Sequence, residues 1–286
     1  MPTRSMRRTL PLFVALMLSV PAAAQEPIAL ADVAHIHGIA FDSRHPGELL
    51  LATHYGLYRT EGNGLARVVS EDGSDYMGFT TNPADPDVLL ASGHPAGGGN
   101  LGVIVSTDGG RTWSQRSKGA SDIVDFHAMT VSRANADIIY GLYRDIQVSR
   151  DGGVNWHIGG PAPGRTIDLA ASSVDADTLY AGTVAGLAVS TNAGATWQMW
   201  GEDVPVTMVE TAPDGRIYAF YAGVGLVTAE PDATDWRLVN GDLGAHDFLH
   251  MAVNPMDDQH LVAVTQDSLV LESRDGGITW KPFGGL

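Results

Sequence analysis

Short apolar stretches separated by polar turns recur along the chain after residue 25. In each repeat an apolar stretch leads into a turn rich in Pro, Asp and Gly, as in residues 82–87, and then into a second apolar stretch such as Val88–Ala91. A Gly-Leu pair opens a third stretch, for example Gly56-Leu57. No stretch keeps the 3.6-residue period of an amphipathic helix. The pattern therefore predicts an all-β chain of short strands joined by tight turns.

An octapeptide of the form Ser-x-Asp-x-Gly-x-Thr-Trp closes four of these repeats. Its copies occupy residues 106–113, 149–156, 190–197 and 273–280. The third copy has Asn192-Ala193-Gly194 in place of Asp-Gly-Gly. A degenerate copy occupies residues 229–236. Asp-Gly-Gly supplies the positive φ angles and side-chain-to-backbone bonds of a tight hairpin turn. The Trp is expected to pack between neighbouring sheets.

The copies lie about forty residues apart, which is the period of a four-stranded propeller blade. Six such repeats fit between residues 25 and 286, and the first has Glu61-Gly62-Asn63-Gly64 in place of the octapeptide. Their innermost strands are predicted to open near His35, Asp75, Asp125, Thr166, Val206 and Asp247. We therefore predict one domain over residues 25–286, a six-bladed β-propeller. Seven blades would require a further repeat that the chain does not show.

The first 24 residues have the features of a secretory signal peptide. Arg4, Arg7 and Arg8 precede an apolar run over residues 10–20, and Pro21-Ala22-Ala23-Ala24-Gln25 supplies an Ala-x-Ala-like cleavage site. The apolar run is too short to span a membrane. We expect a mature protein that is periplasmic or secreted and not inserted in a membrane.

Charge and cysteine content narrow the function classes. The chain carries 17 basic and 33 acidic residues, a net charge of −16, and loss of the leader's three arginines brings this to −19. Such a surface repels nucleic acid and attracts cations. The chain has no cysteine, which excludes disulfides, thiolate metal sites and Cys nucleophiles.

Seven of the ten histidines map to one face of the predicted propeller. We call this face the top; the innermost strands begin there and the second strands end there. The top histidines are His35, His37, His54, His94, His127, His246 and His250. His45 and His260 fall in turns on the opposite face, and His157 follows an octapeptide Trp.

Several imidazoles without a thiolate are the ligands that Cu(II) or Zn(II) selects. His37 and His127 stand at the same place in their repeats, and His250 stands at nearly the same place. We predict a metal site, with copper as the metal and zinc as the alternative, made by His35, His37, His54, His94, His127, His250 and Asp125. Asp75 and Asp247 recur at strand starts like Asp125, and with His246 they either join the site or bond loop amides. Met77 shares the repeat position of His37, and its thioether either fills the core or favours Cu(I).

The combination of His35-Ile36-His37-Gly38, Ser92-Gly93-His94-Pro95 and Asp125-Phe126-His127-Ala128 with the octapeptides resembles exported bacterial Asp-box propellers. Members of that group, also called BNR or sialidase-like propellers, are commonly labelled glycosyl hydrolases. The resemblance covers essentially the whole mature chain and implies the propeller fold. The Arg-Ile-Pro signature of sialidases is missing, however, since residues 35–41 read His-Ile-His-Gly-Ile-Ala-Phe. The histidines also resemble, in site chemistry only, the hub ligands of copper propellers such as nitrous oxide reductase.

Three functions follow from these residues. The first is metal handling or delivery at a histidine site, favoured over redox catalysis and with a periplasmic protein as the other partner. The second is a metal-free scaffold for protein interaction or assembly, which predicts exposed apolar side chains on the top face. The third is sialidase-like glycoside hydrolysis, for which the family resemblance implies three arginines, a Tyr-Glu nucleophile pair and an Asp acid, whereas another glycosidase mechanism needs two carboxylates flanking the scissile bond.

Overall fold

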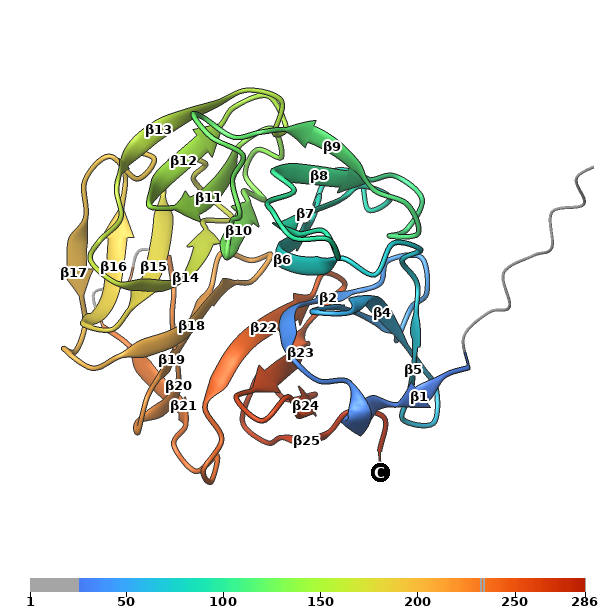
Figure 1. The fold of residues 1–286 in the computed structure, drawn as a ribbon. Coiled ribbons are helices and arrows are strands. Elements are labelled where there is room, and N and C mark those ends of the chain that lie inside the picture. Colours follow the sequence, from blue (N-terminus) through green and yellow to red (C-terminus); the bar gives the residue numbers. More distant parts are fainter. Residues whose placement is uncertain (1–25, 232, 234, 286) are drawn as a thin grey trace, which may run out of the picture.

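Six antiparallel sheets stand around a central axis in the computed structural model (Figure 1). The structure describes residues 26–231, 233 and 235–285, so the predicted signal peptide lies outside the described residues. Over that part of the chain the regular structure is strand, apart from a short 3₁₀ helix, η1 (Leu30–Asp32). The predicted six-bladed β-propeller is confirmed.

Each sheet is one blade, and its first strand is the innermost. Blade 1 contains β2 (Ile36–Phe41), β3 (Leu49–Thr53), β4 (Gly56–Glu61) and β5 (Leu65–Val68), with β1 (Ile28–Ala29) beside β5. Blade 2 contains β6 (Asp75–Thr81), β7 (Leu89–His94), β8 (Val103–Ser106) and β9 (Ser114–Ser117). Blade 3 contains β10 (Ala128–Val131), β11 (Ile139–Tyr143), β12 (Asp145–Ser149) and β13 (Trp156–Pro161).

The second half of the ring repeats this plan. Blade 4 contains β14 (Thr166–Ala171), β15 (Leu179–Thr183), β16 (Gly186–Ser190) and β17 (Gln198–Trp200). Blade 5 contains β18 (Val206–Thr211), β19 (Ile217–Tyr221), β20 (Gly225–Ala229) and β21 (Arg237–Asn240). Blade 6 contains β22 (Phe248–Asn254), β23 (Asp257–Thr265), β24 (Val270–Ser273) and β25 (Lys281–Pro282).

The Asp-box turn is held by its own side chains. In blade 2, Ser106 Oγ donates to Asp108 Oδ1 at 2.9 Å and accepts the amide proton of Gly110 at 2.9 Å. Trp113 Nε1 donates to the carbonyl of Gly110 at 3.0 Å, which ties the indole to the turn. Ser149 and Ser273 make the same bonds in blades 3 and 6. The octapeptide is therefore a self-contained clasp between the third and fourth strands.

In blades 2, 3 and 6 the clasp tryptophan packs against an aromatic residue where the innermost strand begins. Trp113 packs on Tyr76 with ring centroids 5.0 Å apart. Trp156 packs on Phe126 at 5.0 Å, and Trp280 packs on Phe248 at 4.8 Å. Tyr76, Phe126 and Phe248 are fully buried and stand where their innermost strands begin. Stacked aromatic pairs contribute about 0.5–1.5 kcal/mol beyond their buried area.

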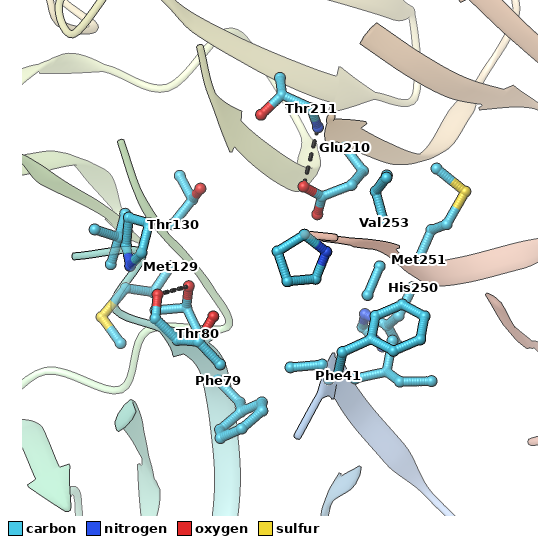
Figure 2. Close-up of a pocket in the computed structure, with 18 of the residues that line it drawn as sticks. Phe41, Phe79, Thr80, Met129, Thr130, Glu210, Thr211, His250, Met251 and Val253 are labelled. Carbon is cyan, nitrogen blue, oxygen red and sulfur yellow. Dashed lines mark hydrogen bonds between the residues drawn. The ribbon is translucent and has the colours of Figure 1, made fainter. Parts of the chain in front are cut away.

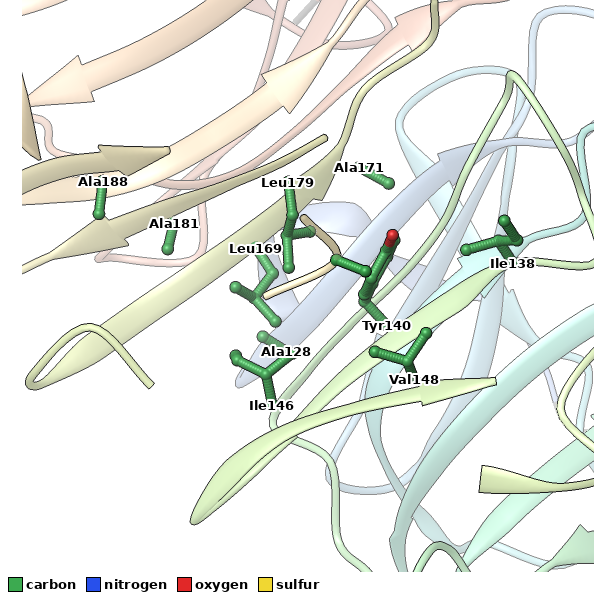
Figure 3. Packing of buried hydrophobic residues seen from close by; sticks show 11 residues of the cluster. Ala128, Ile138, Tyr140, Ile146, Val148, Leu169, Ala171, Leu179, Ala181 and Ala188 are labelled. Carbon is green, nitrogen blue, oxygen red and sulfur yellow. The ribbon is translucent and has the colours of Figure 1, made fainter. Parts of the chain in front are cut away.

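Neighbouring blades are joined by apolar side chains. Between blades 3 and 4, Tyr140, Ile146 and Val148 meet Leu169 and Leu179, all almost fully buried (Figure 3). Comparable clusters fill the other junctions. At about 25 cal/mol per Å² of buried apolar surface, these clusters are the main source of cohesion between sheets that share no strand.

Blades 1 and 6 meet in a junction that we call the seam. Leu30 and Val33, from the segment preceding β2, pack with Val262, Val264 and other buried residues of both blades. Every sheet within the described ranges is built from one continuous stretch, and β1 returns to its own blade by pairing with β5. The ring is therefore closed by side-chain packing and not by a strand exchanged between blades.

Within the described chain, no helix has the length and apolarity required to cross a bilayer.

The Asp-box predicts a specific response to acid. Thr279 donates to Asp275 from its hydroxyl at 2.6 Å and from its amide at 2.9 Å, and these bonds lower the pKa of Asp275 to about 2. The stability that this carboxylate contributes is complete above its unfolded pKa and is lost as the pH falls from about 4 to 2. We expect Asp275→Ala to lower the unfolding midpoint at pH 7 by several degrees and to remove this part of the acid response. Thermal unfolding at pH 7, 4 and 2 tests this.

Asp275→Asn is the matched variant, because blade 4 already uses Asn at this place. Asn192 Oδ1 accepts from Ser190 Oγ at 2.9 Å, and its Nδ2 donates to Thr196 Oγ1 at 2.8 Å. The Asn variant should therefore keep most of the stability at pH 7 and also lose the acid response of this turn. Equal destabilisation by Ala and Asn at pH 7 would contradict this account.

Candidate metal centre

The innermost strands bring the ligand residues to the top of the central channel. In β2 the pairing with β3 passes from Ile36 directly to Gly38, so His37 is the extra residue of a β-bulge. Counted back from the turn that ends each innermost strand, Met77 and His127 occupy the equivalent positions in blades 2 and 3. His250 lies one position further along β22, where blade 4 has Asp168. A bulge redirects a side chain, and His37 lines the channel.

His37, His54 and Asp75 form the first group of ligand atoms, which we call group A. His54 Nδ1 lies 2.7 Å from Asp75 Oδ2, and His37 Nδ1 lies 3.6 Å from Asp75 Oδ1. The rings of His37 and His54 meet edge to face with centroids 4.3 Å apart. The sulfur of Met77 touches His37 Nδ1. Three candidate ligands and a thioether thus converge at the junction of blades 1 and 2.

His35 stands beside group A at the start of β2. Its ring centroid lies 5.0 Å from that of His54, and its backbone adopts φ 54°. The left-handed region is uncommon for a residue with a Cβ, and such conformations concentrate at functional sites. His35 is exposed and lies at the solvent edge of the group.

His94, Asp125 and His127 form the second group, group B. His94 Nε2 and His127 Nε2 lie 3.0 and 2.8 Å from the same oxygen, Asp125 Oδ2. The Asp125 side chain is only 8% exposed, whereas those of His94 and His127 are 39% and 64% exposed. The carboxylate therefore forms the floor of the group, and solvent reaches it past the two imidazoles.

Both groups have the dimensions of a metal site. The ligand atoms within each group all lie within 4.8 Å of one another. A Zn or Cu ion lies about 2.0–2.2 Å from each of its ligands, so atoms spaced on this scale can surround one ion.

Unsatisfied polar atoms support a cation in each group. Asp75 Oδ1 and Asp125 Oδ1 are buried and accept no hydrogen bond. Burying a carboxylate oxygen without a hydrogen-bonding or cationic partner lowers the stability of the fold. His94 adds a second argument, because its Nδ1 lies 2.7 Å from the carbonyl of Gly99 and must donate to it. The opposite ring nitrogen, Nε2, then points at Asp125 Oδ2, 3.0 Å away. The same bond to Gly99 orients the ring as an outer partner of a metal ligand does.

The surroundings of the site shift the pKa values of its histidines in different directions. Burial lowers the pKa of His37, and nearby His54 lowers it further. Burial and the adjacent His37 lower the pKa of His250 to about 4. The bond to Asp125 raises the pKa of His127. At neutral pH, His37 and His250 are thus deprotonated, as metal ligands must be. His127 carries a proton more often than His37 or His250, and a metal binding there would displace that proton.

A cavity of about 530 Å³ runs down the channel from the histidines to the turns of the opposite face. His250, Asp168 and Glu210 line it, and the Glu210 carboxylate projects into it (Figure 2). Asp168 accepts the amide protons of Leu169 and Val209 at 2.9 and 3.0 Å. Burial raises the pKa of Asp168 and that of Glu210 to about 7. Below its imidazole rim, the channel therefore carries two carboxyl groups that hold protons near neutral pH.

The structure separates the predicted ligands. It brings His37, His54, His94, His127 and Asp125 together in two groups, and it places His35 at the edge of group A. His250 lines the channel beside them and hydrogen-bonds the backbone of Ile36. His246 lies 3.9 Å from Asp267 in a loop, and the amide of Asp247 donates to Gln266. Within the described chain, neither His246 nor Asp247 belongs to a group with metal-site spacing.

Histidines of the opposite face have structural partners. His45 Nδ1 lies 2.8 Å from Asp42, and Arg59 contacts both the His45 ring and Glu48. This cluster has metal-site spacing, but the Arg59 guanidinium already occupies it by pairing with Glu48 and contacting the His45 ring. His260 is buried against Phe41 and Asn254.

The sequence left open whether Asp75 joins the metal site, and the predicted site did not include Asp168 or Glu210. The signal for Asp75 was its identical place to Asp125 before an aromatic residue. Asp168 and Glu210 interrupt innermost strands that are otherwise apolar near those positions. Carboxylates within such strands, where the side chains face a channel, are the signal that could have revealed them.

The clasps and the six sheets define an Asp-box β-propeller. The BNR/Asp-box repeat profile matches residues 104–115 and 271–282, which agrees with the resemblance drawn from the octapeptides. No curated protein sequence matches the chain significantly.

Solved structures show the same fold at low identity. The chain is similar to the GH74 xyloglucanase from Xanthomonas campestris, with a TM-score of 0.62 and 19% identity over 91% of this chain, and it spans about half of that enzyme (47%). It is similar to YCF48 bound to D1 peptide, with a TM-score of 0.58 and 20% identity over 92% of this chain and 85% of that one. It is also similar to XC5397 from Xanthomonas campestris, a gluconolactonase, with a TM-score of 0.66 and 13% identity over 86% and 89% of the two chains. At these identities the likeness establishes the fold alone.

The channel carboxyl groups predict how stability changes with pH. Because burial raises the pKa of Glu210 above its unfolded value, the folded chain holds the proton more tightly, and stability falls as the pH rises from about 4 to 7. Glu210→Gln keeps an acceptor for the amide of Thr211 and removes this group's share. We expect the variant to lose less stability than wild type between pH 5 and 8, by on the order of 1–3 kcal/mol. Urea unfolding at the two pH values measures the difference.

Glu71→Gln is the control, since Glu71 is exposed on the surface. Its pH response should match that of wild type. If Glu210→Gln also matched wild type, the channel carboxyl would not be the source of the effect.

Proposed function

We propose that this chain is an exported copper-binding propeller that holds metal at the top of its channel, for metal handling or delivery. The observation that carries the proposal is a pair of carboxylates, Asp75 and Asp125, each with one buried oxygen that lacks a hydrogen-bond partner and each adjoined by two imidazoles. Hydrogen bonding within the fold leaves those oxygens unsatisfied, whereas a cation would satisfy them. Export is inferred from the predicted signal peptide over residues 1–24.

Copper is favoured over zinc by the sulfur in group A. The Met77 thioether touches His37 Nδ1, and thioether and imidazole together are typical of copper sites. Structural zinc sites usually complete four tight ligands with thiolate or further imidazole. A net charge of −16 over the whole chain also attracts cations in general.

Binding is favoured over catalysis because the described residues form candidate ligand groups. Among those residues no electron route to a metal is evident. His54, His94 and His127 are 39–64% exposed, so an ion held there can be loaded and released from solvent. Delivery requires that accessibility, whereas redox turnover additionally requires a route for electrons to and from the metal.

We predict that the mature protein retains stoichiometric copper after dialysis and that His37→Ala combined with His127→Ala abolishes this retention. The double variant removes one imidazole from each group but leaves the clasps and blade junctions intact, so the unfolding midpoint of the metal-free protein should change little. Elemental analysis of the dialysed proteins and thermal unfolding provide the two readouts.

His157→Ala is the matched control, because His157 lies exposed on an outer strand of blade 3. It should retain copper like wild type. Stoichiometric copper in the folded double variant would contradict the proposed site.

A second candidate function, protein interaction at the top face, has its own supporting observation. The hairpins between the second and third strands reach this face, and four of them expose an apolar residue. These residues are Tyr55 (66% exposed), Val184 (42%), Val224 (42%) and Leu269 (40%). Apolar side chains placed around a rim are typical of a docking surface, which suits either a scaffold or a metal-delivery protein.

A photo-reactive amino acid at position 224 tests this candidate against the same substitution at position 158. Ile158 is similarly exposed (48%) but lies on the outer strand of blade 3. We expect one defined adduct in cells from position 224 and none from position 158. A metal-free scaffold predicts the same adduct when His37 and His127 are both alanine, whereas dependence on these histidines points to delivery. Equal labelling from both positions would argue against a docking surface at the top.

A further inference from the structure

We infer that the top of the channel holds two metal ions in two unlike sites, one at group A and one at group B. This inference rests on the proposed metal function and adds the number of ions and their chemical preferences. It starts from the arrangement of the carboxylates, because each group has its own. Asp75 adjoins His37 and His54, while Asp125 adjoins His94 and His127.

The need for a cation arises once in each group. Asp125 is 8% exposed and Asp75 is 18% exposed, and each leaves Oδ1 without a hydrogen bond. In group B, the donor role of His94 Nδ1 toward Gly99 turns the opposite ring nitrogen toward the carboxylate. One ion in group A would leave the Asp125 oxygen unsatisfied, and one ion in group B would leave the Asp75 oxygen unsatisfied. Two ions satisfy both.

The two sites are neighbours, because blade 2 contributes a ligand to each of them. Asp75 of group A, on β6, is the direct cross-strand partner of His94 of group B, on β7. Directly opposed residues of an antiparallel pair have Cβ atoms about 4.5–5.5 Å apart. Gly93 permits this close approach, because a Cβ at that position would clash with the carbonyl oxygen of Asp75.

The ligand types make the sites unlike. Group A combines two imidazoles and a carboxylate with the soft sulfur of Met77, which touches His37. Group B offers imidazole and carboxylate alone, and blade 3 has His127 at the position where blade 2 has Met77. Soft thioether ligands favour Cu(I), whereas imidazole and carboxylate suit Cu(II) and Zn(II). Group A is thus assigned to Cu(I) and group B to Cu(II) or Zn(II).

The test counts ions and then removes one site at a time. The mature protein is titrated anaerobically with Cu(I) in competition with a chromogenic Cu(I) chelator, and separately with Cu(II) and with Zn(II), with bound metal measured by elemental analysis. We expect two copper ions per chain. His54→Ala should lose the tightly held Cu(I) and keep one Cu(II), and His94→Ala should show the reverse. Metal-free unfolding midpoints establish that each variant is folded.

Met77→Leu tests the difference between the sites, because Leu keeps the volume and removes the sulfur. We expect Cu(I) affinity to fall about tenfold or more, with Zn(II) and Cu(II) binding at group B unchanged. The spectrum of bound Cu(II) in wild type should be altered by His94→Ala and not by Met77→Leu. Unchanged Cu(I) affinity in the Leu variant would overturn the assignment of group A.

The outcomes separate this inference from the proposed function. A single ion per chain, lost in both His54→Ala and His94→Ala, would overturn the two-site arrangement while leaving copper binding in place. No bound metal under any condition would overturn the proposed function itself.

Discussion

The contact between an innermost-strand aromatic ring and an Asp-box tryptophan is the interaction on which the top face depends. Tyr76 and Phe126 are anchored in this way by Trp113 and Trp156. Successive side chains of an extended chain point in opposite directions. An anchored ring therefore turns the residue on each side of it toward the channel and the top face. In blade 2 these neighbours are Asp75 and Met77, and in blade 3 they are Asp125 and His127. A clasp on the far face thus positions ligand side chains on the other.

Much of this arrangement can be read from the sequence, because the fold repeats and the ligands share a repeat position. The octapeptides predict the blades, and the repeat position of His37 and His127 predicts their common face. The contacts between blades could not be read in the same way. That Asp75 meets His54 of the preceding blade, while Asp125 meets His94, depends on how adjacent sheets are rotated against each other. That rotation is set by packing among clusters such as the one around Tyr140 and Leu169, which have no short sequence signature.

The bulges are the second feature that sequence could not give. In β22 the extra residue is Leu249, so His250 occupies the place that Asp168 has in β14 and not the place of His37. A shift of one residue decides whether an imidazole stands at the rim or deeper in the channel wall. The same register places Asp168 and Glu210 along the channel below the rim. The resulting channel changes from imidazole side chains at the top to protonatable carboxyl groups below.

The seam between blades 1 and 6 gives the ring an inherent asymmetry. Every other junction is spanned by the polypeptide itself, whereas within the described chain this one is held by the side chains around Leu30 and Val264 and by the bond between His250 and the backbone of Ile36. The ring is therefore interrupted along the polypeptide at this seam, where blades 1 and 6 are held together by non-covalent contacts. Widening of the ring would begin at the seam and would move β2, and with it His37, away from β22. The spacing between His37 and His250 across the channel mouth therefore depends on how tightly the side chains of this seam pack.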